Sequence, residues 1–285
     1  MNYNDFARDI FCKIENKMSV VAERSVNIIA DGCDTHGRYR DCRGTYWWTN
    51  GFFGGLNLLL YNETKKECYL KCAESSEMRL DFALENEIDE LHHDVGFMWH
   101  ILSGAKHRLL GDGASRTRNL YAASLLASRF ILGGGFIEAW NGRGAENITI
   151  IDTLMNLPLL YWASREISND RYKRIAMAHA DAAIKTHLRP DGSVAHIVEH
   201  DRESGEVIRT FGGQGYAEGS AWSRGSAWAI YGFMLSYIHT GEERYLKAAV
   251  SAADYFISGI SQDGTVPAFQ IQGGDNAVIA LHIQG

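Results

Sequence analysis

The stretch RYKRIAMAHADAAIKTHLRPDGSV, residues 171–194, recurs in the same 285-residue chain as RYLKAAVSAADYFISGISQDGTV, residues 244–266. Both copies begin with Arg-Tyr, continue as an alanine-rich segment that contains Ala-Asp, and end in Asp-Gly, a hydroxyl residue and valine. Self-similarity at a fixed spacing is the sequence signature of stacked structural units. This repeat therefore decides the fold.

A second helix precedes each copy. The segments 153–170 and 225–243 are apolar on most sides and end in a polar turn, as expected of a helix buried on both faces. Weaker copies of the helix pair occupy 49–84 and 94–130. Such hairpins cannot bury their inner helices alone and must stack side by side.

Stacked hairpins can form an open solenoid or a closed ring, and the glycine-rich stretches before the inner helices favour the ring. We predict an all-α fold, an (α/α)6 barrel of six hairpins. A first helix at about 5–30, four hairpins and a last apolar stretch at 276–285 make about ten helices, where a full ring needs twelve. The prediction is one domain over 1–285 that is short of its last helices.

Composition excludes several classes of function. The net charge is −7, with no block of Lys or Arg, so we expect no nucleic-acid partner. The first residues lack the features of a signal peptide, and no apolar run could span a membrane, which predicts a cytoplasmic protein without a membrane partner. Cys68 and Cys72 are interpreted as free buried thiols in a reducing cytosol rather than as zinc ligands.

Polar and aromatic residues cluster where loops enter the inner helices, and all of these junctions are expected at one end of the fold. Trp rings, amides and paired carboxylates together are typical of a carbohydrate site, where two acids carry out proton transfer. The candidate residues are Trp48, His93, Asp94, Trp140, Asp152, His196, Gln214, Arg224 and Trp228.

Each candidate has a structural alternative. Asp94 and Asp152 each stand at the first turn of an inner helix, where an acid commonly serves as a cap. His92, His93 and Asp94 suggest a metal, but we expect adjacent histidines to point in different directions and predict no metal. The GGQG run at 212–215 lacks the spacing of a nucleotide-binding loop, and the chain has no G-x-S-x-G nucleophile elbow.

Five motifs together resemble one enzyme family. They are WWTNGFFGG (47–55), HDVGF (93–97), IIDTLMNLPLLYWAS (150–164), DGSVAHIV (191–198) and GGQGYAEGSAWSRGSAWAIYGF (212–233). Their order is that of the unsaturated glucuronyl hydrolases, glycoside hydrolase family 88, which are related to the unsaturated rhamnogalacturonyl hydrolases of family 105. The family chains are longer at their C-terminal end.

The resemblance implies a hydrolase that removes a terminal 4,5-unsaturated uronic acid from oligosaccharides produced by polysaccharide lyases, without a cofactor. It makes Asp152 the general acid/base and Asp94 its partner. It also places His196, Gln214, Arg224 and Trp228 against the sugar, with Trp48 and Trp140 as walls. The alternatives are a rhamnogalacturonyl hydrolase and a catalytically impaired glycan-binding relative; the oligomeric state is left open.

The chemistry accounts for an acid in so apolar a segment as 150–162. Protonating carbon C4 of the unsaturated sugar requires a donor that keeps its proton near neutral pH. Desolvation and a second carboxylate raise the pKa of an Asp by one or more units. We therefore expect Asp94 and Asp152 to lie close together.

Overall fold

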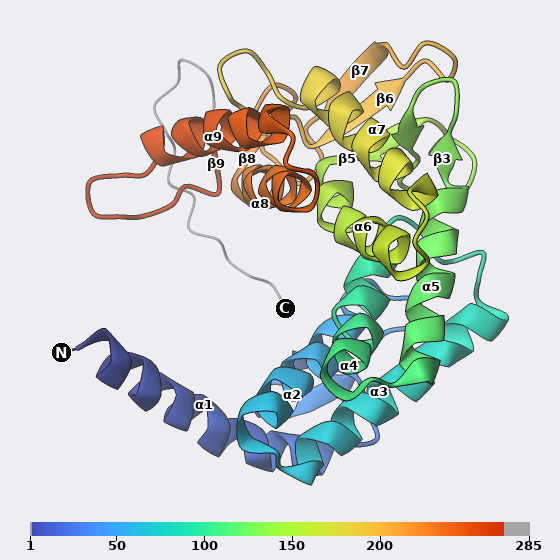
Figure 1. The fold of residues 1–285 in the computed structure, drawn as a ribbon. Helices are drawn as coiled ribbons and strands as arrows, with labels where there is room; N and C mark the ends of the chain where they lie inside the picture. The colour runs from blue at the N-terminus through green and yellow to red at the C-terminus, as the bar shows by residue number, and fades with distance from the viewer. Residues whose placement is uncertain (1, 271–285) are drawn as a thin grey trace. The chain divides into compact units, whose positions relative to one another are not determined.

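The computed structural model describes residues 2–270. Over this range the chain is mainly helical, with helices paired as hairpins and a few short strands in the loops between them (Figure 1). The predicted stretch 276–285 lies outside the described residues. Within residues 2–270, no helix combines the length and the apolar character needed to cross a bilayer.

The helices follow the predicted hairpin order. The first is a single helix, and the following helices come in consecutive pairs; Figure 1 labels each of them. The helices are α1 (Tyr3–Ser25), α2 (Asn50–Thr64), α3 (Glu67–Asn86), α4 (Ser103–Leu110), α5 (Gly113–Ser128), α6 (Leu157–Glu166), α7 (Arg171–Thr186), α8 (Ser223–Thr240) and α9 (Glu243–Ser258).

Short strands form in the connections, which the sequence did not lead us to expect. They pair antiparallel as β1–β2, β3–β4, β5–β6–β7 and β8–β9. The strands are β1 (Ala30–Cys33), β2 (Tyr39–Asp41), β3 (Phe130–Ile131), β4 (Phe136–Ile137), β5 (Ile148–Ile150), β6 (Ile197–His200), β7 (Val207–Phe211), β8 (Ala221–Trp222) and β9 (Phe269–Gln270).

The chain divides into two compact units. The first comprises the residues up to Leu91 together with Phe97–Asn119, and the second comprises His92–Gly96 and the described residues from Leu120 onward. In the first unit, α1, α2 and α3 share a core that includes Val21, Phe53 and Tyr69. The second unit contains α6 to α9 and the three-stranded sheet.

The two copies of the repeat build the same local structure. Tyr172 and Tyr245 are buried, and each carries the preceding arginine over its ring, with guanidinium-to-centroid distances of 4.9 and 4.7 Å. Each Asp-Gly pair makes a turn in which the glycine has a positive φ, 87° at Gly192 and 82° at Gly264. Residue-type identity between the copies thus reflects identical structural roles.

The cysteines agree with the sequence interpretation only in part. Cys68 and Cys72 are free thiols, but only Cys72 is buried. Its Sγ donates to the carbonyl oxygen of Ala22 at 3.0 Å. Cys68 is half-buried because it lies beside a shallow hollow of about 230 Å³ on the α1 side of α3.

Candidate functional site

Asp152 follows strand β5 directly. It lies in the first turn of a short 3-10 helix, Ile151–Met155, after which α6 begins at Leu157. The sequence predicted a helix over 153–170 with Asp152 at its first turn. Pro158 has no N–H to donate to the carbonyl four residues earlier, so the α-helix begins only at the proline's own first turn.

The Asp152 carboxyl group is shielded from water and makes few contacts. Its side chain is 20% exposed, and its buried Oδ1 atom makes no hydrogen bond within residues 2–270. Burial, and next the negative charge of Asp94, raise the pKa of Asp152 to about 7, against the opposing charge of Arg224. No side-chain bond caps the 3-10 helix, whose N-cap is Ile150, so capping does not explain this acid.

Asn156 connects the two aspartates. Its Nδ2 atom donates to Asp94 Oδ1 at 3.2 Å and to the Asp152 carbonyl oxygen at 3.3 Å. Asn156 is fully buried, and a Cβ atom on Gly96 would lie 2.6 Å from its Oδ1. The glycine two residues after Asp94 therefore lets this loop approach Asn156, which brings Asp94 and Asp152 together as predicted.

Asp94 is also a strongly perturbed acid. Burial raises its pKa, and the charge of His92 and the hydrogen bond from Asn156 act in the opposite direction. Two neighbouring carboxyl groups that both resist ionisation hold fewer than two negative charges near neutral pH. The pair is therefore suited to keeping one proton ready for transfer.

Two histidines flank Asp94. His92 Nδ1 and His93 Nε2 each lie 3.6 Å from Asp94 Oδ2. The buried His93 also shares a hydrogen bond of 2.6 Å between its Nδ1 and Thr153 Oγ1. Burial is the main cause that lowers the pKa of His92 to about 4 and of His93 to about 3. Both rings are therefore neutral at pH 7.

The expectation that these adjacent histidines point apart is wrong. Their ring centroids are 5.4 Å apart, and one ligand atom from each of His92, His93 and Asp94 lies within 4.8 Å of the others. The loop that brings Asp94 to Asn156 turns both rings to the same side. This donor set suits a divalent cation, and the absence of a metal stays a prediction.

His196, Gln214 and Arg224 form a connected group next to Asp152. His196 Nε2 lies 3.7 Å from Asp152 Oδ1, and its Nδ1 accepts a hydrogen bond of 3.0 Å from the Gln214 backbone N–H. Arg224 donates to Gln214 Oε1 at 2.6 Å, and its guanidinium lies 4.3 Å from the centre of the Trp222 ring. Burial lowers the pKa of His196 to about 4, so this ring is neutral as well.

The glycine-rich loop serves His196 rather than a phosphate. Gly213 has a φ of 57°, and a Cβ atom at this position would lie only 2.0 Å from His196 Nδ1. Glycine is thus required twice at Gly213, for its backbone conformation and for the close approach of the ring. The sequence offered no structural role for Gly213, and the absence of a nucleotide-binding loop stays a prediction.

The tryptophans divide between the units. Trp228 is half-buried on α8, near enough to lower the pKa of Asp152, and Trp140 is 36% exposed in the loop after β4. Trp48 belongs to the other unit, where its ring packs on Phe97 at a centroid distance of 5.5 Å. Its role as a wall of the site stays a prediction.

Three residues at this site were not singled out from the sequence. Asn156 and Thr153 lie within the segment quoted around Asp152, where their polarity in an apolar run was the available sequence signal. Nothing in the sequence pointed to Arg129. Its guanidinium donates to the carbonyl oxygens of Glu138 and Trp140 and to Asn141 Oδ1, at 2.7 to 2.8 Å, and its charge acts on Asp94.

Comparison with known proteins identifies relatives. No family model matches the chain. The chain is 38% identical over 226 residues to an unsaturated glucuronyl hydrolase of Bacillus sp. (strain GL1), covering 77% of this chain and 59% of the relative. It is 32% identical over 218 residues to an unsaturated chondroitin disaccharide hydrolase of Streptococcus pneumoniae (strain ATCC BAA-255 / R6), covering 76% and 55%.

A solved structure supports the same relation. The unsaturated glucuronyl hydrolase from Bacillus sp. GL1, described as responsible for the degradation of glycosaminoglycan, matches with a TM-score of 0.80 and 32% identity. The match covers 88% of this chain and 68% of that one. It confirms the predicted all-α class of the α/α-barrel enzymes. The chain spans between half and two thirds of the length of the curated relatives named above.

Proposed function

The chain belongs to the family of the unsaturated glucuronyl hydrolases, and we propose that it removes a terminal 4,5-unsaturated uronic acid from oligosaccharides. The observation that carries this proposal is the Asp152 carboxyl group, whose pKa is raised to about 7 beside Asp94. A carboxylic acid that stays protonated near neutral pH is a general acid matched to this pH range.

The proposed reaction is a hydration of the C4=C5 double bond. The Asp152 proton is transferred to C4, whose new C–H bond takes the π electron pair and leaves a cation at C5 stabilised by the ring oxygen. Water then bonds to C5 and returns a proton to the Asp152 carboxylate. The hemiketal opens to a C5 ketone, and the hemiacetal left at C1 expels the rest of the glycan as an alcohol.

Asp94 and Asn156 act on this cycle through Asp152. The charge on Asp94 raises the pKa of Asp152 before proton transfer. Asn156 holds the Asp94 carboxyl group and the Asp152 backbone through its two hydrogen bonds. Because the rings of His92 and His93 are neutral, they add no positive charge beside the pair that would lower the pKa of Asp152.

Arg224 and Gln214 would receive the substrate's own carboxylate. Arg224 is exposed and held between Gln214 and the Trp222 ring, so a cation is presented close to Asp152 without being buried. An arginine fixed in this way suits bidentate binding of a carboxylate. The His196 Nε2 atom faces Asp152 Oδ1 and is placed to hold a sugar hydroxyl beside it.

The substrate class proposed is the unsaturated disaccharide released from glycosaminoglycans, since one relative is named for a chondroitin disaccharide. The rhamnogalacturonan version would use the same acid and the same alkene. Parallel rates on an unsaturated chondroitin disaccharide and an unsaturated galacturonyl-rhamnose separate the two. A faster rate on the second substrate would replace the first assignment.

The test follows the ultraviolet absorbance of the conjugated double bond as it disappears. Wild-type protein is expected to remove the absorbance of the unsaturated disaccharide. Asp152→Asn is expected to lose roughly 100- to 10,000-fold in rate, because proton transfer by a positioned acid contributes 10² to 10⁴-fold. Asp254→Asn, an exposed acid on α9, is the matched control and should keep the wild-type rate. An Asp152→Asn protein with the wild-type rate, or calorimetric sugar binding with an intact double bond in the wild type, contradicts the proposal.

A further inference from the structure

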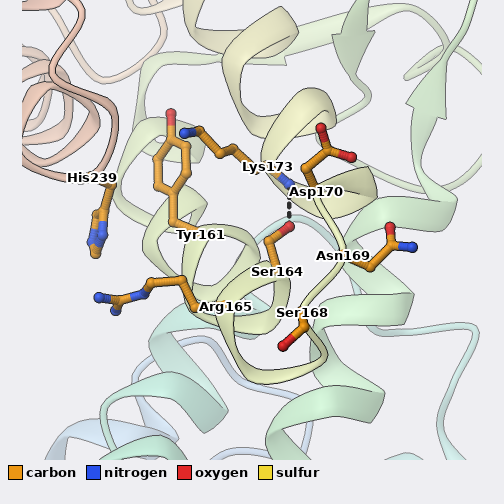
Figure 2. A pocket seen from close by; sticks show the side chains of 8 residues that line it. All are labelled: Tyr161, Ser164, Arg165, Ser168, Asn169, Asp170, Lys173 and His239. Carbon is orange, nitrogen blue, oxygen red and sulfur yellow. Dashed lines mark hydrogen bonds between the residues drawn. The ribbon is translucent and has the colours of Figure 1, made fainter.

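A hollow of about 590 Å³ lies away from Asp152, at the opposite end of α6 (Figure 2). The last turn of α6, the turn at 167–170, the first turn of α7 and the end of α8 surround it, and all of them belong to the second unit. Its volume falls within the range of ordinary small-molecule sites, roughly 300 to 1,000 Å³. None of the residues predicted for the hydrolytic site lines it.

Basic side chains predominate around this hollow. Arg165, Lys173 and His239 line it, and none of the three forms an ion pair within residues 2–270. Arg165 is exposed, while Lys173 and His239 are half-buried. The one acid in the lining, Asp170, is already paired with Arg174, which lies outside the lining, at 2.9 Å. Positive charge in the hollow is therefore left uncompensated.

These basic groups are also close enough to act on one another. The pKa of His239 is lowered first by burial and then by the charges of Arg165 and Lys173. The imidazole is thus neutral at pH 7, which leaves Arg165 and Lys173 as the two cations of the hollow. In Figure 2 the Lys173 side chain extends toward Tyr161.

A buried phenol completes the lining. Tyr161 is 2% exposed, and its hydroxyl makes no hydrogen bond of standard geometry within the described part of the chain, although the Ser236 hydroxyl lies near enough to lower its pKa against the effect of burial. The Tyr161 ring stacks on His239 with a centroid distance of 5.0 Å, which fixes its orientation. An unpaired buried hydroxyl carries a desolvation cost that a bound polar group would remove.

Helix dipoles explain part of this arrangement but not all of it. Arg165 and His239 stand in the last turns of α6 and α8, where a basic residue is favoured. Lys173 stands in the first turn of α7, where a cation is disfavoured and an anion is welcome. Neither the position of Lys173 nor the unpaired Tyr161 hydroxyl follows from the needs of the helices.

We propose that this hollow is a second ligand site that binds a sugar acid, with the carboxylate held between Arg165 and Lys173 and the hydroxyl groups toward Tyr161 and Asn169. The two cations select an oxyanion, and the neutral hydroxyl and amide groups beside them match a polyhydroxylated body. The site is independent of the hydrolytic reaction, because none of its residues belongs to the Asp94–Asp152 group.

The experiment measures the binding of D-glucuronate to the full chain by calorimetry, with D-glucose and inorganic sulfate as comparison probes. Lys173→Gln and Arg165→Gln are expected to weaken glucuronate binding about tenfold each, which is about 1.4 kcal/mol, because each removes a charged donor to the carboxylate. Tyr161→Phe should also weaken it. Lys247→Gln removes an exposed cation from α9 and should leave binding unchanged. All four variants should keep the wild-type rate on the unsaturated disaccharide if the chain has that activity.

Each probe has an outcome against the proposal. The proposed site is wrong if glucuronate binds Lys173→Gln as tightly as it binds the wild type, or if it does not bind the wild type. Glucose that binds as tightly as glucuronate removes the role of the cations. Sulfate that binds as tightly as glucuronate removes the role of Tyr161 and Asn169. Since binding is read without catalysis, these results stand whether or not the chain hydrolyses the disaccharide.

Discussion

Asn156 is the residue on which the acid pair depends. A single buried amide group contacts the Asp94 carboxylate and the Asp152 backbone, so the two acids keep their separation although 58 positions separate them in the sequence. The pKa of Asp152 is then set by where Asp94 stands. On the other side of Asp152, Gly213 performs a comparable task for His196, because it leaves room for the ring.

Replacing Gly213 by alanine should dislodge His196. The new Cβ atom would lie 2.0 Å from His196 Nδ1, and the positive φ adds backbone strain. We expect the rate on the unsaturated disaccharide to fall about 10- to 100-fold, as misplacement by one ångström can cause. Gly219→Ala is the control, because Gly219 has a φ of 83° with open space around it.

The control separates strain from displacement. Both variants should lose on the order of 1 kcal/mol of unfolding free energy from the backbone, and only Gly213→Ala should lose activity. Equal rates in the two variants would show that His196 is not positioned by this glycine.

Residue-scale prediction from the sequence relied on motifs that keep their polar residues in a recognisable order. Asp94, Asp152, His196, Gln214 and Arg224 were proposed in this way. The structure places them near one another, and their roles in the reaction stay predictions. Arg129 was not singled out, because a basic residue that directly follows a helix is usually solvated and carries no motif of its own. The shared direction of His92 and His93 depends on loop dihedral angles, which spacing alone does not determine.

At the scale of the helix, a recurring tyrosine on the second helix of a hairpin forms a hydrogen bond with an earlier helix. Tyr69 of α3 donates to Glu15 on α1, Tyr172 of α7 shares a hydrogen bond with Ser124 on α5, and Tyr245 of α9 donates to the carbonyl oxygen of Met177 on α7. Helices α3, α7 and α9 are thus each tied to an earlier helix by a tyrosine hydroxyl. Helix α5 has no such buried tyrosine, because its Tyr121 is 61% exposed.

Tyr245→Phe should destabilise the protein without changing its fold. The variant loses the bond to Met177 and the contact with Arg244, at 3.2 Å each, from a fully buried side chain. We expect a loss of about 1 to 2 kcal/mol in the free energy of unfolding, measured in urea. Tyr121→Phe, which changes a tyrosine that is 61% exposed, should leave the midpoint of urea unfolding unchanged. An equal shift of the midpoint in both variants would argue against a stabilising bond from Tyr245 to Met177.

Helices could be predicted from the sequence because their apolar faces repeat, whereas the strands could not. Most of the strands β1 to β9 have only two to four residues, too few for an alternating pattern to stand out. The break between the 3-10 helix and α6 was readable from Pro158, whose effect we underestimated in the apolar run. Local sequence patterns therefore did not predict the short strands and the 3-10 helix that form in the connections between helices.

At the scale of the molecule, buried histidines make the protein sensitive to acid. Burial lowers the pKa values of His92 and His196 to about 4 and of His93 and His187 to about 3. The unfolded chain binds these protons at about pH 6.5, so below that pH the unfolded state takes up more protons than the folded one. The raised pKa values of Asp94 and Asp152 act in the opposite direction, but the histidines are more numerous.

We therefore expect the free energy of unfolding to fall as the pH is lowered from about 6.5 to 4. Each histidine contributes roughly 1.4 kcal/mol per pH unit in this window. Urea titrations at several pH values measure the slope. His36→Gln, at an exposed position, should keep the wild-type slope, and His187→Gln should reduce it. A stability that is flat or rises toward pH 4 would mean that these histidines are protonated in the folded protein.

The most direct measurement is the titration of the Asp152 carboxyl carbon by NMR in the wild type and in Asp94→Asn. We expect a pKa of about 7 in the wild type. We expect a lower value in Asp94→Asn, because removing the neighbouring charge makes ionisation of Asp152 easier. A wild-type pKa near 4, or a pKa that does not respond to the change at position 94, would contradict the proposed coupling of the two acids.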